Sequence, residues 1–281
     1  MSFKSSNVLS CPLDGLPLEQ DEKRLLCEHG HSFDIARHGY VNLLAASDKR
    51  SQDPGDSKDM VVARREFLNA GHYLPVANRL VDLLRPGLDS SSVIVDAGCC
   101  EGYYLQQLQT QLAFTEDCQP SLIGFDISKW AVQAASRRLS ATWLVASNRN
   151  MPVAQNSADC VLSLFGFPVF ESFQQVLKEG GRLLCVNAGP RHLLELREII
   201  YPQVKHSEST VVTQALAAGF TAGETSTLTF NTNPLKREDI QRLLTMTPHL
   251  FRASQEGKER AAQLDQLAIT VDVVFQFLHK Q

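Results

Sequence analysis

Short apolar runs alternate with amphipathic stretches through the middle of this chain. The runs are rich in β-branched residues, which is typical of strands buried on both faces, and the stretches between them have the period of helices. The pattern predicts strands at Val93–Val95, Ser121–Asp126, Thr142–Ala146, Ala158–Leu164 and Arg182–Val186, and helices at Tyr103–Leu112, from the cap Ser128 to Leu139, and at Phe170–Leu177. Such alternation predicts an α/β fold with a mostly parallel sheet.

The pattern is less regular toward the two ends of the chain. Gly180-Gly181 is typical of a turn, and Pro190 can open a helix because its missing N–H costs nothing there. We expect helices at Met60–Ala70, Pro75–Leu84, Arg191–Val204 and Lys236–Thr245, and strands at Thr225–Phe230 and Thr270–Leu278. The two late strands are expected to add an antiparallel edge to the sheet.

The loop after the first of the central strands carries a chemical signal. Asp96 ends that strand, and Gly98 and Gly102 bracket the turn before the next helix. A dinucleotide site would need G-x-G-x-x-G. The spacing instead resembles D-x-G-x-G-x-G, the S-adenosylmethionine loop of Rossmann-like methyltransferases, with Cys100 at the middle glycine. Asp126 ends the next strand, where it can accept hydrogen bonds from both ribose hydroxyls. The alternative is any α/β domain with a glycine turn at this place.

Composition narrows the class of protein. The 281 residues are 43% hydrophobic and 21% charged, which is ordinary for a globular protein that buries its own core. No apolar run approaches the roughly 20 residues of a membrane span, and the first residues lack the core of a signal peptide, so we expect a cytoplasmic protein with no membrane partner. Seven scattered cysteines favour reduced thiols or a metal site over disulfides. Because the net charge is −4, any surface that binds nucleic acid must be a local positive patch.

A second cluster of candidate ligands lies near the N-terminus. Cys11 and Asp14 are followed, after twelve residues, by Cys27 and His31. Structural zinc takes four N, S or O ligands from two short turns that face each other, and these pairs have that spacing. His29 could compete as a ligand, and the alternative is that the cluster binds nothing. With zinc, roughly the first forty residues would form a module too short to fold on an apolar core alone.

A polar segment, residues 47–59, separates this cluster from the first helix and has no apolar period, which is typical of a linker. Lys49 and Arg50 lie in the segment, Arg64 and Arg65 lie on the helix after it, and acidic residues are interleaved with these cations. The cations could bind the phosphates of a nucleic acid, or they could form a solvated surface of mixed charge. The sequence favours neither interpretation over the other.

Four longer motifs make the chain resemble one family over nearly its whole length. They are KRSQDPGDSKDM (Lys49–Met60), ARREFLNAGHY (Ala63–Tyr73), EGYY (Glu101–Tyr104) and GPRHLLEL (Gly189–Leu196). The family is that of the bacterial 23S rRNA (guanine-N(1)-)-methyltransferases. The resemblance implies a Rossmann-like methyltransferase fold with a seven-stranded sheet and a small zinc-binding module. It places an RNA-recognition module at residues 1–45, a linker and helix at 46–75, and the methyltransferase domain at 76–281.

The resemblance also implies ligands: S-adenosylmethionine, one structural zinc ion, a 23S rRNA hairpin and, as a possible assembly, a homodimer. The expected cofactor-binding residues are Tyr73, Asp96, Gly98, Cys100, Glu101, Gly102, Asp126 and His192; the metal ligands are Cys11, Asp14, Cys27 and His31; the RNA-binding residues are Lys49, Arg50, Arg64 and Arg65. The chain departs from the family's pattern at Asp14, where a cysteine is expected, at Cys100, and at Phe165-Gly166-Phe167-Pro168 after the fourth strand.

The implied reaction needs little covalent chemistry from the protein. A guanine must be unstacked and its nitrogen 1 aligned with the methyl–sulfonium bond, while a base or water takes the proton. We therefore expect aromatic walls and acceptors, assign no catalytic residue, and regard Tyr73 and His192 as candidates to bind the cofactor or the base. Two other functions stay open: a small-molecule methyltransferase whose N-terminal module is a lid, and a cofactor-binding relative that has lost activity.

Overall fold

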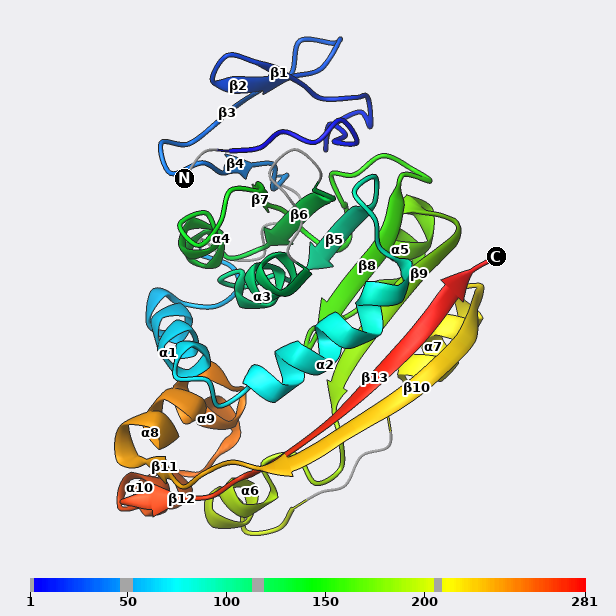
Figure 1. Ribbon diagram of the computed structural model, residues 1–281. Coiled ribbons are helices and arrows are strands. Elements are labelled where there is room, and N and C mark those ends of the chain that lie inside the picture. Colours follow the sequence, from blue (N-terminus) through cyan, green and yellow to red (C-terminus); the bar gives the residue numbers. More distant parts are fainter. Residues whose placement is uncertain (1–2, 46–52, 113–118, 205–208) are drawn as a thin grey trace.

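The computed structural model describes residues 3–45, 53–112, 119–204 and 209–281. Its centre is an eight-stranded sheet (Figure 1) formed by β4 (Val41–Asn42), β5 (Val93–Ala97), β6 (Ser121–Asp126), β7 (Thr142–Val145), β8 (Ala158–Leu164), β9 (Leu177–Ala188), β10 (Phe220–Asn231) and β13 (Thr270–Lys280). The order is β10-β13-β9-β8-β5-β6-β7-β4. Strands β4 to β9 are parallel, and β13 and β10 are antiparallel to their neighbours. The predicted α/β sheet with an antiparallel edge is confirmed, and β4 adds an eighth strand to the seven expected.

Helices cover both faces of this sheet. They include α1 (Lys58–Asn69), α2 (Leu74–Leu84), α3 (Tyr103–Leu112), α4 (Lys129–Ala135), α5 (Phe170–Val176), α6 (Leu194–Ile200) and α7 (Val211–Ala217). Side chains on β5 alternate between the two cores: Ile94 packs with α1 to α4, whereas Val93 and Val95 pack with α5 and α7. Within the described ranges, no helix is long and apolar enough to cross a membrane.

Several predicted elements have different bounds in the structure. Strand β10 begins at Phe220 rather than at Thr225. The helix that Ser128 caps ends at Ala135 rather than at Leu139. The Gly180-Gly181 turn does not precede a strand but lies inside β9, where the pairing with β8 shifts register and Gly180 has a φ of 72°. The apolar period predicts the centre of an element, whereas local contacts and backbone geometry determine where the element ends.

The helix predicted from Arg191 also starts late, at Leu194. The Arg191 backbone N–H donates to the Asp272 carboxylate at 2.9 Å, and Leu193 adopts a left-handed φ of 55°. These contacts hold residues 191–193 in a turn against β13. This turn places His192, which follows Arg191, beside the cleft described below.

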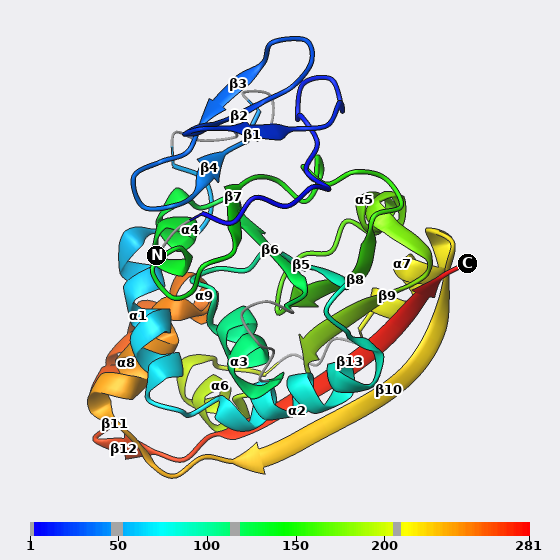
Figure 2. The same ribbon diagram turned by 45° about the horizontal axis from the view of Figure 1, so that its top comes forward.

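The N-terminal segment is joined closely to the main sheet. It forms a three-stranded antiparallel sheet of β1 (Glu19–Asp21), β2 (Arg24–Leu26) and β3 (Ser32–Asp34), which lies beyond the β4 edge of the main sheet (Figures 1 and 2). Leu9, Leu25 and Val41 share one apolar core with residues of the central strands. The segment therefore does not rely on a core of its own, which agrees with the expectation that it is too short to have one.

An insertion between β10 and β13 contributes part of the wall of the cleft described below. It contains β11 (Leu235–Lys236), α8 (Arg237–Met246), α9 (His249–Arg252), α10 (Gln255–Ala262) and β12 (Gln266–Leu267). Helix α8 lies beside α1 in both ribbon views (Figures 1 and 2). The Arg242 guanidinium is 2.9 Å from the Glu66 carboxylate, and His72 is 3.2 Å from Asp239. These contacts fix α1 against α8 and so fix the residues that both helices present to the cleft.

Candidate active site

A cleft of about 1000 Å³ opens at the carboxyl ends of the parallel strands. Strand β5 lies between β6 and β8, so the strand order reverses here, and ligands of open α/β sheets bind at such a point. The wall is built by the loops after β5 to β9, by α1 and by the end of α8. It includes Asp56, Arg64, Tyr73, Asp96, Gly98, Cys100, Glu101, Asp126, Arg149, Phe165, Phe167, His192 and Met246.

Asp96 is a buried carboxylate that lacks a partner. The residue is 1% exposed, and neither carboxylate oxygen has a hydrogen-bond partner among the described residues. Burial, with the nearby charges of Asp126 and Glu101, raises the pKa of Asp96 to about 8. A buried polar group without a partner is costly in a folded protein. An ammonium group such as that of the methionine part of S-adenosylmethionine would satisfy this carboxylate.

Asp126 is held at the end of β6 by two backbone N–H groups. Cys100 N–H donates to one oxygen at 3.0 Å, and Ser128 N–H donates to the other at 2.8 Å. Burial raises the pKa of this carboxyl, and the two N–H donors oppose the rise. Each carboxylate oxygen has further lone pairs, so the side chain can still accept hydrogen bonds from two ribose hydroxyls.

The loop after Asp96 contains small residues because its backbone adopts left-handed φ angles and packs closely against its neighbours. Gly98 has a φ of 92°, and a side chain there would project toward open space in the cleft. Gly102 has a φ of 78°, and a Cβ would lie 2.8 Å from the Trp143 ring, so glycine lets α3 pack close to β7. Cys100 adopts a φ of 47°, which explains the glycine that the family's pattern places there. The backbone thus keeps the form that the motif predicts.

Glu101 is also buried in the loop, and it has one defined partner. Its carboxylate is 2.8 Å from the Nε of Arg138, while its other oxygen has no partner among the described residues. Burial raises the pKa of Glu101, and Arg138 opposes the rise. Glu101 therefore lies in the expected crevice, with one oxygen anchored to the protein.

Three rings gather in the wall of the same cleft. The Tyr73 hydroxyl is 3.2 Å from the Nε2 of His192, and the His192 ring stacks on Phe165 with centroids 5.9 Å apart. The Asp272 backbone N–H donates to the Nδ1 of His192 at 3.2 Å, so the imidazole proton lies on Nε2 and points at Tyr73. Burial lowers the pKa of His192 to about 4, and the ring is neutral. The predicted pair of Tyr73 and His192 is thus brought together, with Phe165 beside it.

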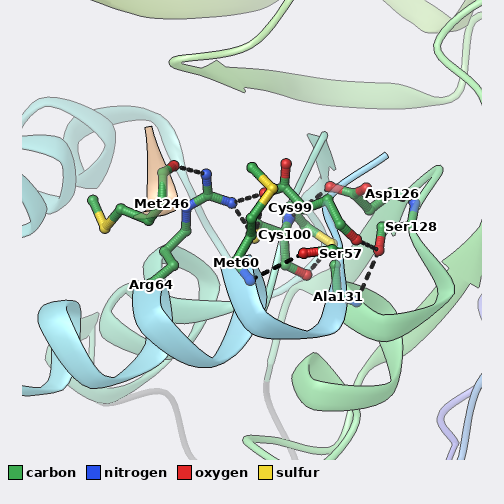
Figure 3. Close-up of polar contacts among 10 residues, drawn as sticks. Ser57, Met60, Arg64, Cys99, Cys100, Asp126, Ser128, Ala131 and Met246 are labelled. Carbon is green, nitrogen blue, oxygen red and sulfur yellow. Dashed lines mark hydrogen bonds and ion pairs between the residues drawn. The ribbon is translucent and has the colours of Figure 1, made fainter. Parts of the chain in front are cut away.

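Arg64 has a different environment from the one expected. Its guanidinium forms an ion pair with Asp56, donates to the Cys100 sulfur at 2.7 Å and donates to the Met246 carbonyl oxygen at 2.6 Å (Figure 3). Arg64 thus faces the loop after β5, and its role in RNA binding stays a prediction. Asp56 was not singled out from the sequence, where only its place in the Lys49–Met60 motif could have signalled it.

The other three predicted RNA-binding residues are less defined. Lys49 and Arg50 lie outside the residues that the structure describes. Arg65 is half-buried on α1 and makes no hydrogen bond or ion pair with a described residue. Its guanidinium is available to an outside ligand, and its role in RNA binding stays a prediction.

Cys11, Asp14, Cys27 and His31 come together as the sequence predicts, with ligand atoms all within 4.8 Å of one another. The Nδ1 of His31 is 3.5 Å from the Cys11 sulfur, 3.3 Å from the Cys27 sulfur and 3.0 Å from Asp14 Oδ2. Zinc–ligand lengths give tetrahedral edges of about 3.3–3.8 Å, so this donor set fits a zinc ion. His29 lies outside the group and contacts Asp14 at 3.1 Å.

Comparisons with known proteins agree with this geometry. Residues 9–52 match the zinc-ribbon model described as "RlmA, N-terminal", and residues 94–186 match a methyltransferase domain model. The 23S rRNA (guanine(748)-N(1))-methyltransferase of Streptomyces fradiae is 31% identical over 276 residues, 95% of each chain. The chain belongs to the 23S rRNA (guanine-N(1)-)-methyltransferase family. A Micromonospora griseorubida relative, named provisionally for the same class of reaction, is 35% identical over 67% of this chain and 68% of its own.

A solved structure supports the fold alone. One chain of the complex between the Haloferax volcanii Trm112 methyltransferase activator and a methyltransferase has a TM-score of 0.50 and 17% identity, covering 80% of this chain and 98% of that chain. Family membership makes this protein a methyltransferase that uses S-adenosylmethionine and carries a zinc ribbon. When bound, the cofactor supplies an electrophilic methyl group on sulfur. The unpartnered Asp96, the oriented Asp126 and the open backbone at Gly98 fit its ammonium, ribose and methionine parts.

Proposed function

We propose that this protein transfers the methyl group of S-adenosylmethionine to nitrogen 1 of a guanine in a hairpin loop of 23S rRNA. The observation that carries the proposal is the continuity of one cleft, whose wall holds both the acids Asp96 and Asp126 and the rings of Tyr73 and Phe165. A purine that has left its stack needs a flat apolar wall and a few polar partners. The Streptomyces fradiae relative is named for this reaction.

The chain's own residues position the base rather than attack it. Both ring nitrogens of His192 are used, one by the Asp272 N–H and the other by Tyr73, so His192 has no free lone pair for the guanine proton. Because His192 donates to the Tyr73 oxygen, the Tyr73 hydroxyl proton is free to point at an acceptor such as the guanine O6. Burial raises the pKa of Tyr73, which keeps that proton in place. The proton on guanine nitrogen 1 then leaves to water.

The hairpin is proposed to lie between the zinc ribbon and the cleft. In this proposal residues 1–45 recognise RNA, residues 46–75 form a linker and helix, and residues 76–281 form the methyltransferase domain. Lys49, Arg50 and Arg65 would contact phosphates, which sets register without reading sequence. Phe167, 84% exposed at the rim of the cleft, would stack on a loop base. A homodimer stays a prediction that sedimentation can decide.

The test combines 23S rRNA from cells with and without the gene with the purified protein. Methylation of nitrogen 1 blocks Watson–Crick pairing, so reverse transcription should stop at one guanine only where the protein acts, and mass spectrometry should find one added methyl group in that fragment. The Asp126→Ala variant is the control for contaminating activity. Identical rRNA from both strains, with no transfer in vitro, would contradict the proposal and favour a small-molecule substrate or lost activity.

A further inference from the structure

Arg64 is a cation built into the wall of the cofactor crevice. It reaches from α1 to the loop after β5, and its side chain is 22% exposed, which leaves it accessible from the cleft. The recorded partners Asp56, Cys100 and Met246 use three of its five N–H groups, so two donors have no partner among the described residues. A guanidinium in this state is oriented by the protein and can still bind an anion.

The charges of the cleft show which anion needs this cation. The described wall contains four carboxylates, from Asp56, Asp96, Glu101 and Asp126. The cofactor's methionine part also carries a carboxylate, which these groups would repel unless a cation lay beside it. The other arginine of the described wall, Arg149, is exposed and follows β7, two strands away from the Asp96 strand. Arg64 instead touches the side chain of Cys100 in the loop that follows Asp96.

We propose that Arg64 binds the carboxylate of the methionine part of S-adenosylmethionine. Asp96 receives the ammonium group of the same zwitterion, so the two side chains recognise its two opposite charges. Asp56 and the Met246 carbonyl hold the guanidinium in place for this contact. The inference rests on the cofactor part of the proposed function and is independent of its RNA part.

The experiment measures how much the protein gains from the ligand's carboxylate. Calorimetry on the full chain gives the affinities of S-adenosylmethionine and of its decarboxylated analogue, which keeps the ammonium and sulfonium groups. The wild-type protein should prefer S-adenosylmethionine by on the order of 10- to 100-fold, as expected for a charge-assisted fork. In Arg64→Ala the two affinities should differ by no more than about twofold. The variant should bind S-adenosylmethionine more weakly, because its carboxylate loses the guanidinium, whereas the analogue has no carboxylate to lose a partner.

Matched variants separate recognition from support of the fold. Arg65→Ala removes the same charge from the neighbouring position of α1 and should keep the full preference. Arg64→Lys keeps the charge without the fork and should give an intermediate preference, which also serves if Arg64→Ala unfolds. A full preference in Arg64→Ala would overturn the proposal. Equal weakening of both ligands would also overturn it, because Arg64 would then support only the shape of the crevice. Neither result depends on RNA methylation.

Discussion

Asp96 should make cofactor binding a proton-release reaction. In the free protein, burial with the charges of Asp126 and Glu101 raises the pKa of Asp96 to about 8, so at pH 7 about 0.9 of the molecules carry its proton. An ammonium group bound against this carboxylate stabilises the ionised form and lowers the pKa again. Binding at pH 7 is therefore expected to release about 0.9 proton per cofactor.

The same shift sets the size of the pH effect on affinity. Below pH 8, each decrease of one pH unit lowers the ionised fraction of Asp96 about tenfold. The free energy of cofactor binding then becomes less favourable by about 1.4 kcal/mol per pH unit. From pH 6 to 7.5, the dissociation constant should fall about 20- to 30-fold. The effect of pH on folding stability has the opposite sign. Between about pH 4 and pH 8, the native state keeps the Asp96 proton, whereas the unfolded chain has lost it. Asp96 therefore lowers the free energy of unfolding of the free protein as pH rises through this range.

Calorimetry with S-adenosylhomocysteine, in two buffers of different ionisation enthalpy, measures the released proton directly. Asp96→Asn keeps the volume of the side chain but cannot ionise, so it should bind weakly, with no pH dependence and no proton release. Glu101→Gln is the matched control, and it should still release the proton. A wild-type binding heat that is the same in both buffers would refute the reasoning, as would a pH dependence that survives in Asp96→Asn.

Three further perturbations test the rest of the site. Asp126→Ala removes the acceptor of two backbone N–H groups and the proposed acceptor of the ribose hydroxyls. Calorimetry should therefore show cofactor binding weaker by about 2 kcal/mol or more; unchanged affinity would remove Asp126 from the site. Asp14→Cys should slow the loss of zinc to a chelator, because a thiolate replaces a carboxylate; equal rates of metal loss would show that residue 14 is not a ligand. Phe167→Ala should weaken hairpin binding in fluorescence anisotropy by about 1–3 kcal/mol, whereas Phe167→Tyr should bind normally; equal binding by all three proteins would exclude stacking.

The acidic part of the crevice could be predicted because several sequence signals coincide there. An apolar run ends at Asp96, glycines follow at the spacing of a tight loop, and a second run ends at Asp126. Parallel strands bring such ends to one edge of a sheet, so no long-range information was needed to place the two acids together. The clustering of the four candidate zinc ligands could be predicted for a similar reason, since two short turns carry all of them.

The place of Arg64 could not be predicted in this way. Arg64 and Arg65 are neighbours, and successive residues of a helix point about 100° apart, so only one of them can face a given wall. Which of them faces the cleft depends on how α8, from the far end of the chain, packs against α1 and brings Met246 to the guanidinium. Strand β4 escaped prediction because two residues, Val41 and Asn42, carry no period.

The substitution at Cys100 changes the loop less than the missing glycine suggests. A left-handed residue other than glycine costs about 1 kcal/mol or more, and the loop accepts that cost at a φ of 47°. The backbone N–H of Cys100 still donates to Asp126, so the contact that orients this carboxylate is kept. Its thiol points to Arg64 (Figure 3). Because the cradle is made by the backbone and by the two acids, the departure from the motif leaves the means of binding S-adenosylmethionine in place, which argues against a relative that has lost its cofactor.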